Sequence, residues 1–225
     1  MSSVLFARRI LSQPLRSSIS KIMTTGIPSA SAKMQTQAAS STSDQPSFES
    51  VGVKHTSISQ APGVNLSPHQ KLVVGSVLDL FEGRPSLRHL DLWSKDATFA
   101  DPLTVAEGYD RYAAQWYGLP TVFSPINLVS HTVTSAGNPI EIDLDNKYTL
   151  KGVKKEQEIK SKVKIWLDES AGGKINKVED RWNDKLPDGP ISQAFRKLNA
   201  VTVPTMVKVP KTQEEDEKMR AAREE

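Results

Sequence analysis

The sequence predicts a domain of the α+β class, in which about three helices come first and a run of long antiparallel strands follows. Apolar residues recur at helical spacing in 68–82 and again, after a glycine, in 109–117. Apolar and polar residues then alternate through 139–150 and 156–168, as they do in half-exposed strands. Because helices and strands are largely segregated along the chain, the sheet is expected to pack its helices on one side.

Composition divides the 225-residue chain into unlike parts. The net charge is +3, but the first 43 residues hold five cationic residues and no acid, so the remainder is net acidic. The domain therefore lacks the basic footprint of a nucleic-acid-binding protein. The absence of cysteine excludes disulfides and thiolate metal sites. No apolar run approaches the roughly 20 residues that span a bilayer.

Residues 1–24 have the composition of a transit peptide. Apolar side chains can share one helical face there, arginine and serine occupy the other, and acids are absent. The pair Arg8-Arg9 interrupts the apolar run that a secretory signal needs, and it favours a mitochondrial over a plastid address. A basic tail without a targeting role is the alternative. Residues 25–63 are mainly small and polar, which predicts a disordered linker.

The predicted domain covers residues 64–186. Ser67 suits the N-cap of its first helix, and Pro68 suits the first helical position. A short second helix is expected over 85–92. It contains His89, which we interpret as a structural helix residue rather than a site residue.

The stretch around residue 101 holds the most unusual residues. A strand over 93–99 should stop at Asp101, because Pro102 cannot donate to a ladder. Alternation places Phe99 and Asp101 on the same face. A carboxylate on an apolar face is either paired or has a perturbed pKa. Gly108 then opens a third helix, whose aromatic stripe must pack on something: Tyr109, Tyr112, Trp116 and Tyr117.

Further strands are expected over 127–135, 139–150, 156–168 and 174–183. Acidic residues on the second of these face lysines on the third, which predicts cross-strand charge pairs of a few tenths of a kcal/mol each. A C-terminal extension over 187–210 contains one short amphipathic helix. The charged tail at 211–225 has almost no apolar face and is expected to be solvated or frayed.

This order of elements resembles the nuclear transport factor two-like superfamily, in its SnoaL-like branch. The resemblance covers residues 67–186, and its most specific pieces are the segment WSKDATFADPL, the glycine-led helix after it and the late strand EDRWN. It implies a cone-shaped fold in which a strongly curved antiparallel sheet wraps about three N-terminal helices. It also implies a pocket at the wide end and, in many members, pairing through the sheet into dimers.

The superfamily includes ketosteroid isomerase, limonene epoxide hydrolase, scytalone dehydratase and polyketide cyclases, together with proteins that have no catalysis. Its enzymes use an Asp or an Asp/His pair to accept a proton and Tyr or Trp to hold the substrate. The resemblance places Asp101 at the strand-end acidic position and Asp180 and Trp182 on the last strand, while Tyr112 and Trp116 lie on the pocket-lining helix. The chain departs from the enzymes, since it has no isomerase-type Tyr–Asp pair and no Asp-Arg-Asp hydrolase set.

The candidate catalytic residues are thus Asp101, His131 and Asp180, and the candidate ligand-binding residues are Phe99, Tyr112, Trp116 and Trp182. Each has a plainer alternative. The carboxylate of Asp101 can cap a turn, His131 can be a satisfied sheet histidine, and Asp180 can pair with Arg181. The aromatic residues can be ordinary core.

Two functions stay open. The first is a pocket domain that binds a small apolar molecule, with or without proton-transfer catalysis of the isomerase, dehydratase or cyclase type. Such chemistry needs no cofactor, and the chain has neither a Gly-rich phosphate loop nor metal-spaced histidines. The second is a non-catalytic mitochondrial module that dimerises or docks a partner through the sheet, with Trp166 as its anchor.

Overall fold

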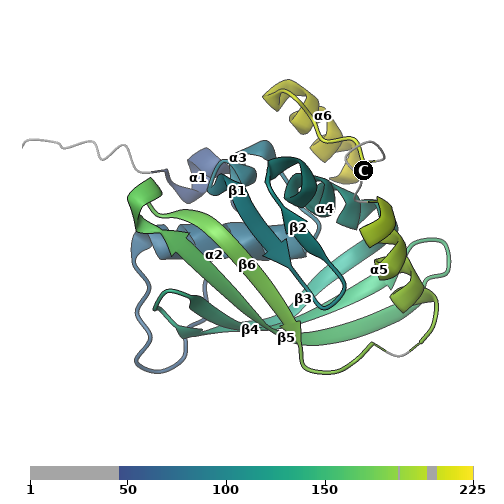
Figure 1. Ribbon diagram of the computed structural model, residues 1–225, viewed down its shortest axis with the longest axis horizontal. Coiled ribbons are helices and arrows are strands. Elements are labelled where there is room, and N and C mark those ends of the chain that lie inside the picture. Colours follow the sequence, from purple (N-terminus) through teal and green to yellow (C-terminus); the bar gives the residue numbers. More distant parts are fainter. Residues whose placement is uncertain (1–45, 187, 202–206, 225) are drawn as a thin grey trace, which may run out of the picture. The chain divides into compact units, whose positions relative to one another are not determined.

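The computed structural model describes residues 46–186, 188–201 and 207–224 (Figure 1). Six strands form one sheet in the order β2-β1-β6-β5-β4-β3, which is open because β2 and β3 are its edges. The α+β class is confirmed. One pairing departs from a purely antiparallel sheet, since β1 and β6 run parallel. The strands are β1 (Trp93–Ala100), β2 (Val105–Glu107), β3 (Phe123–Ser135), β4 (Ile140–Leu150), β5 (Glu156–Asp168) and β6 (Lys174–Trp182).

The helices begin where the capping residues predict. Ser67 at the N-cap and Gln70 in the first turn form a reciprocal capping box on either side of Pro68. Gly108, with φ of 82°, is the N-cap of the aromatic-rich helix. None of the helices in the described part of the chain is long and apolar enough to cross a bilayer. The helices are α1 (Phe48–Val51), α2 (Pro68–Phe81), α3 (Leu87–Leu90), α4 (Tyr109–Val122), α5 (Pro190–Val201) and α6 (Gln213–Glu224).

The core lies between α2, α4 and the inner face of the sheet. Trp116 on α4 is 1% exposed and is the centre of an aromatic cluster. Its ring centroid lies 4.6 Å from that of Phe99, 5.2 Å from that of Phe81 and 6.0 Å from that of Trp93. The predicted aromatic stripe therefore packs against β1 and α2.

The outer face of the sheet carries the predicted charge ladder. Glu141 is in register with Lys164, and their charged atoms are 2.7 Å apart. Asp143 and Lys162 pair in the same way at 2.6 Å. These pairs leave the outer face polar and largely neutralised.

The predicted linker ends earlier than the sequence indicates. Residues 25–45, like the predicted transit peptide, lie outside the described residues, but 46–63 are ordered. Val51 and Val53 are buried against α2. Gly75 makes this close approach feasible, because a Cβ there would lie 2.3 Å from the carbonyl oxygen of His55. Two valines in a polar stretch are too weak a signal to reveal this docking.

The expectation of a solvated C-terminal tail is wrong. Helix α6 docks on the domain through Asp216, which is 4% exposed although it lies in a charged sequence. Its carboxylate accepts hydrogen bonds from the hydroxyl of Tyr117 at 2.6 Å and from the backbone N–H of Leu87 at 2.8 Å. A buried carboxylate with two donors therefore anchors this helix, together with Met219, which packs against the core.

Replacing Asp216 by alanine is expected to release α6. Each hydrogen bond to a charged group contributes about 1.5–3 kcal/mol, and the variant leaves the buried Tyr117 hydroxyl without its acceptor. Amide hydrogen exchange over residues 213–224 should then approach the rate of an unfolded peptide. Glu214→Ala is the control, because the ion pair of Glu214 among the described residues is with Lys218, one turn away at the surface. Unchanged protection in Asp216→Ala would contradict this account of the docking.

Candidate functional site

Five of the seven predicted site residues line one small cavity inside the curve of the sheet. The cavity has a volume of about 20 Å³, enough for one water molecule. The predicted residues on its wall are Phe99, Asp101, Trp116, Asp180 and Trp182. Its remaining walls are formed by Phe81, Gln115, Leu119, Tyr148 and Phe195.

Asp180 on β6 is the most unusual group in this cavity. The indole N–H of Trp182 donates to its Oδ2 at 2.8 Å, while its Oδ1 is buried without a hydrogen-bond partner among the described residues. Burial raises the pKa of Asp180 to about 7, and the charge of Asp101 adds to this, while the neighbouring hydroxyl of Ser161 and the indole N–H of Trp182 oppose it. Its carboxyl can therefore give or take a proton near neutral pH.

Asp101 has a structural role and also faces the cavity. Its Oδ1 accepts the backbone N–H of Leu103 at 2.7 Å, which fixes the turn after β1. Burial raises its pKa, against the opposing effect of hydrogen bonds from Leu103 and Thr104. The carboxylate of Asp101 thus both fixes the turn and lines the cavity beside Asp180.

Two predicted site residues lie away from the cavity. The hydroxyl of Tyr112 donates to the carbonyl of Ser94 at 3.1 Å, and its ring stacks on Trp93 with centroids 4.9 Å apart. His131 on β3 accepts the backbone N–H of Ser59 at 3.1 Å through Nε2, so it helps to hold the segment before α2. Burial and the neighbouring His55 lower the pKa of His131.

Sequence reasoning assigned none of the five remaining wall residues to the site, among them Tyr148, Gln115 and Phe195. Tyr148 lies on the inward face of β4, where the alternation through Ile142 and Leu144 could have found it. Gln115 on α4 has a buried Oε1 without a hydrogen-bond partner in the described part of the chain. Phe195 comes from α5, and no local pattern indicates that this helix returns to the sheet.

Phe195 closes the cavity from the side of α5. Its ring centroid lies 4.5 Å from that of Phe123, 5.4 Å from that of Tyr148 and 5.5 Å from that of Trp182. A larger hollow of about 500 Å³ lies outside, and Trp182 lines both spaces. Trp182 therefore separates the buried carboxyl groups from an open surface depression.

The titration of Asp180 gives a pH-dependent prediction. The folded chain holds this proton up to about pH 7, against an ordinary pKa of 3.8. The group therefore stabilises the fold fully below pH 3.8, and this contribution is lost as the pH rises towards 7, at no more than about 1.4 kcal/mol per pH unit. Asp180→Asn removes this titration. Between pH 4 and 7 its free energy of unfolding in urea should therefore rise relative to that of the wild type. Parallel pH profiles for Asp180→Asn and the wild type would contradict the raised pKa of Asp180.

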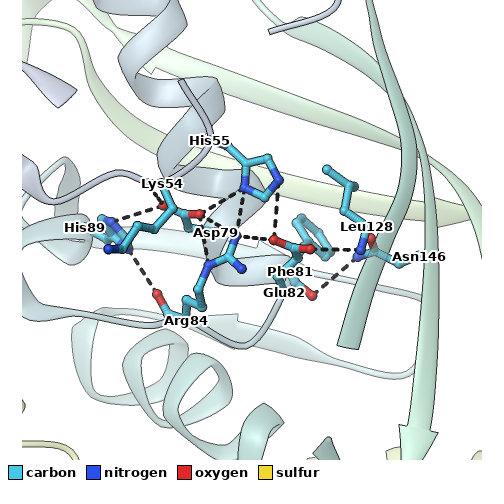
Figure 2. A network of polar contacts seen from close by, with 9 residues as sticks. All are labelled: Lys54, His55, Asp79, Phe81, Glu82, Arg84, His89, Leu128 and Asn146. Atoms are coloured by element: carbon cyan, nitrogen blue, oxygen red, sulfur yellow. Dashed lines mark hydrogen bonds and ion pairs between the residues drawn. The ribbon is translucent and has the colours of Figure 1, made fainter. Parts of the chain in front are cut away.

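A second group of polar residues surrounds the end of α2 (Figure 2). His55 Nδ1 lies 3.0 Å from Asp79 Oδ1, and His55 Nε2 lies 3.3 Å from Glu82 Oε2. The guanidinium of Arg84 contacts Asp79 at 2.9 Å and also bonds Glu82. Burial acts to raise the pKa of Asp79, but hydrogen bonds from His55, Lys54 and Arg84 outweigh it and hold the pKa below its ordinary value.

These residues include the one set in the described chain with the spacing of a metal site. The donor atoms of His55, Asp79 and Glu82 all lie within 4.8 Å of one another. Arg84 already supplies a cation to the same two carboxylates. The arrangement is therefore an ion-pair network that ties residues 54–55 to α2.

No family model matches the chain, and no curated protein matches its sequence. Among solved structures, the chain is similar to a hypothetical protein from Catenulispora acidiphila, which has a ketosteroid isomerase-like fold and was solved in complex with trimethylamine. The two sequences are 13% identical, the TM-score is 0.41, and the match covers 48% of this chain and 82% of that chain. An NTF2-like protein of unknown function from Burkholderia pseudomallei is 16% identical with a TM-score of 0.41, and the match covers 49% of this chain and 90% of that chain. An NTF2-like protein of unknown function from Exiguobacterium is 18% identical with a TM-score of 0.41, and the match covers 50% of this chain and 99% of that chain. NTF2-like proteins are among the solved structures that this chain is similar to, at TM-scores of 0.41.

Proposed function

We propose that this domain binds a small, flat, apolar molecule inside the curve of the sheet and that Asp180 exchanges a proton with it. The observation that carries the proposal is the Oδ1 of Asp180, which is buried without a partner among the described residues and faces an aromatic-walled cavity. A buried carboxyl whose pKa lies near neutrality is typical of a general acid or base.

The present cavity is too small for an organic ligand, so binding requires Phe195 to leave it. Ligand pockets usually measure several hundred Å³, against the 20 Å³ found here. Helix α5 belongs to a small hydrophobic cluster that is separate from the main core. Opening this cluster costs less than disrupting the core, because fewer apolar contacts are lost.

The two carboxyl groups have complementary positions for proton transfer. Asp180 in its ionised form can accept a proton from carbon or oxygen, and the Trp182 N–H holds its second oxygen in place. Asp101 lies on the same wall and can stabilise or receive the transferred proton. Isomerisation returns the proton to another carbon, dehydration breaks a C–O bond and releases water, and aldol-type cyclisation forms a C–C bond; each includes removal of a proton from carbon and fits the site equally well.

Phe195→Ala is expected to enlarge the cavity and to increase binding of a neutral bicyclic ketone such as 2-tetralone. Proton transfer is read from the exchange of its α-hydrogens in D₂O, followed by NMR. Wild-type protein should accelerate this exchange, Phe195→Ala should do so at lower ketone concentration, and Asp180→Asn should lose at least 100-fold, the usual contribution of a general base.

The control is Asp143→Asn, which removes a carboxylate from the outer face of the sheet. Its exchange rate should equal that of the wild type. Equal rates for Asp180→Asn and the wild type would refute the catalytic role of Asp180. Failure of Phe195→Ala, although folded, to bind the ketone would refute the pocket itself.

The alternative, a non-catalytic module that pairs through the sheet, has weaker support. The outer face neutralises its own charges, and Trp166 lies beneath the ammonium of Lys177, 4.7 Å from the ring centroid. A dimer by light scattering that Trp166→Ala converts to a monomer would favour this alternative. Mitochondrial delivery is likewise a proposal from residues 1–24, tested by import of a chain that lacks them.

A further inference from the structure

A pocket of about 350 Å³ lies on another part of the domain, where five cationic side chains meet one carboxylate, that of Glu82. The five cations are Lys54, Arg84, Lys151, Arg220 and Arg223. We propose that this pocket binds a small organic phosphate. The inference is independent of the proposed chemistry at Asp180.

The cations come from four separate segments that the fold brings together. Lys54 follows α1, Arg84 follows α2, and Lys151 follows β4. The two other arginines lie on α6, the helix that Asp216 docks on the domain. A site assembled from such distant segments is more specific than a run of neighbouring lysines, since it exists only in the folded chain.

The side chains differ in how far their charge is already balanced. Arg84 is paired with Asp79 and Glu82. By contrast, the ammonium groups of Lys54 and Lys151 and the guanidinium of Arg220 have no carboxylate within 4 Å among the described residues. Three unbalanced cations at one concave surface create a positive potential that attracts an anion.

Arg223 is held in place at the edge of the pocket. It donates to the carbonyl oxygen of Pro85 at 3.0 Å, and its guanidinium carbon lies 5.8 Å from the ring centroid of Tyr117. A guanidinium fixed in this way loses little conformational entropy when it binds an oxyanion.

The pocket has room and chemistry for more than an inorganic ion. Its volume lies within the range of small-molecule sites. Pro120, Pro125 and Ile126 contribute apolar surface beside the cations, which suits the carbon skeleton of an organic ligand. A phosphate monoester carries close to two charges at neutral pH and offers three acceptor oxygens, so it can engage several cations where a carboxylate engages fewer.

The test uses the full chain and phenyl phosphate as the probe, with isothermal titration calorimetry as the readout. Phenyl phosphate should bind, phenol should not, and raising the salt concentration should weaken binding because the interaction is ionic. The double variant Lys151→Gln/Arg220→Gln should bind at least tenfold more weakly. These two side chains have no ion pairs in the described structure, so circular dichroism should show an unchanged fold.

Lys162→Gln/Lys218→Gln is the matched control, because it removes two exposed cations outside the pocket. A second arm measures co-sedimentation with vesicles that contain phosphatidic acid, which identifies a lipid phosphate as the source of the same chemistry. Loss of either binding in the pocket variant alone supports the site. Absence of both bindings in the wild type, or equal loss in the two double variants, overturns it.

Discussion

Asp79→Ala is expected to destabilise the domain by about 3–5 kcal/mol, the usual cost of removing one partner from a buried ionic network. The side chain of Asp79 is 0% exposed, and its two oxygens accept from the backbone N–H of Lys54 at 2.7 Å and from the side chains of Arg84 and His55. Without the carboxylate, the backbone N–H of Lys54 loses its acceptor, and the guanidinium of Arg84 keeps only Glu82 as an ionic partner among the described residues. Urea unfolding at neutral pH measures the loss.

Asp143→Ala supplies the matched control for this variant. Asp143 is also ion-paired, with Lys162 at 2.6 Å, but its side chain is 58% exposed. Exposed pairs contribute about 0–1 kcal/mol, so the control should unfold almost as the wild type does. If Asp79→Ala lost no more than Asp143→Ala, the network in Figure 2 would have no role in stability.

Trp116→Ala is the second variant with a large expected effect. Its ring fills the space between α2, α4 and β1, and Phe81, Trp93 and Phe99 surround it. Truncation of a buried aromatic residue costs about 3–5 kcal/mol through lost transfer energy and the cavity left behind. Differential scanning calorimetry should show a much lower melting temperature.

Trp166→Ala compares the same change on the outer face. Trp166 is only half-buried there, and its main partner is the ammonium of Lys177. Loss of an exposed cation–π contact should cost about 0.5–1 kcal/mol. Similar losses for the two tryptophan variants would mean that the core around Trp116 can repack freely.

The parts of the fold that could be predicted have local causes. The alternation in 139–150 and 156–168 gave β4 and β5 with their facing charges, and the capping residues gave the start of α2. Strand β2 is three residues long and carries no pattern of its own. The docking of 46–63 and of α6 depends on contacts with residues far away in sequence, Gly75 and Tyr117, which no local pattern reveals.

The same distinction holds for the candidate site. Asp101 and Phe99 could be assigned to one face because they belong to one strand, and Asp180 with Trp182 for the same reason. His131 satisfied the same alternation rule, but its side chain contacts the segment before α2. Phe195 could not be predicted, since its place depends on how a separate helix returns across the open end of the sheet.

The parallel pairing of β1 with β6 has a consequence for how the chain folds. Trp93 lies opposite Ile175, so the two halves of the sheet join only through residues far apart in sequence. Strands β3 to β6 can form as successive antiparallel neighbours, and β1 pairs locally with β2. During synthesis, however, the edge of β1 opposite β2 has no partner until β6 has left the ribosome. Topologies of this kind fold slowly, because the entropy of closing a long loop is lost before the stabilising contacts form. Until then the edge of β1 presents unpaired backbone N–H and C=O groups that can pair with a wrong strand.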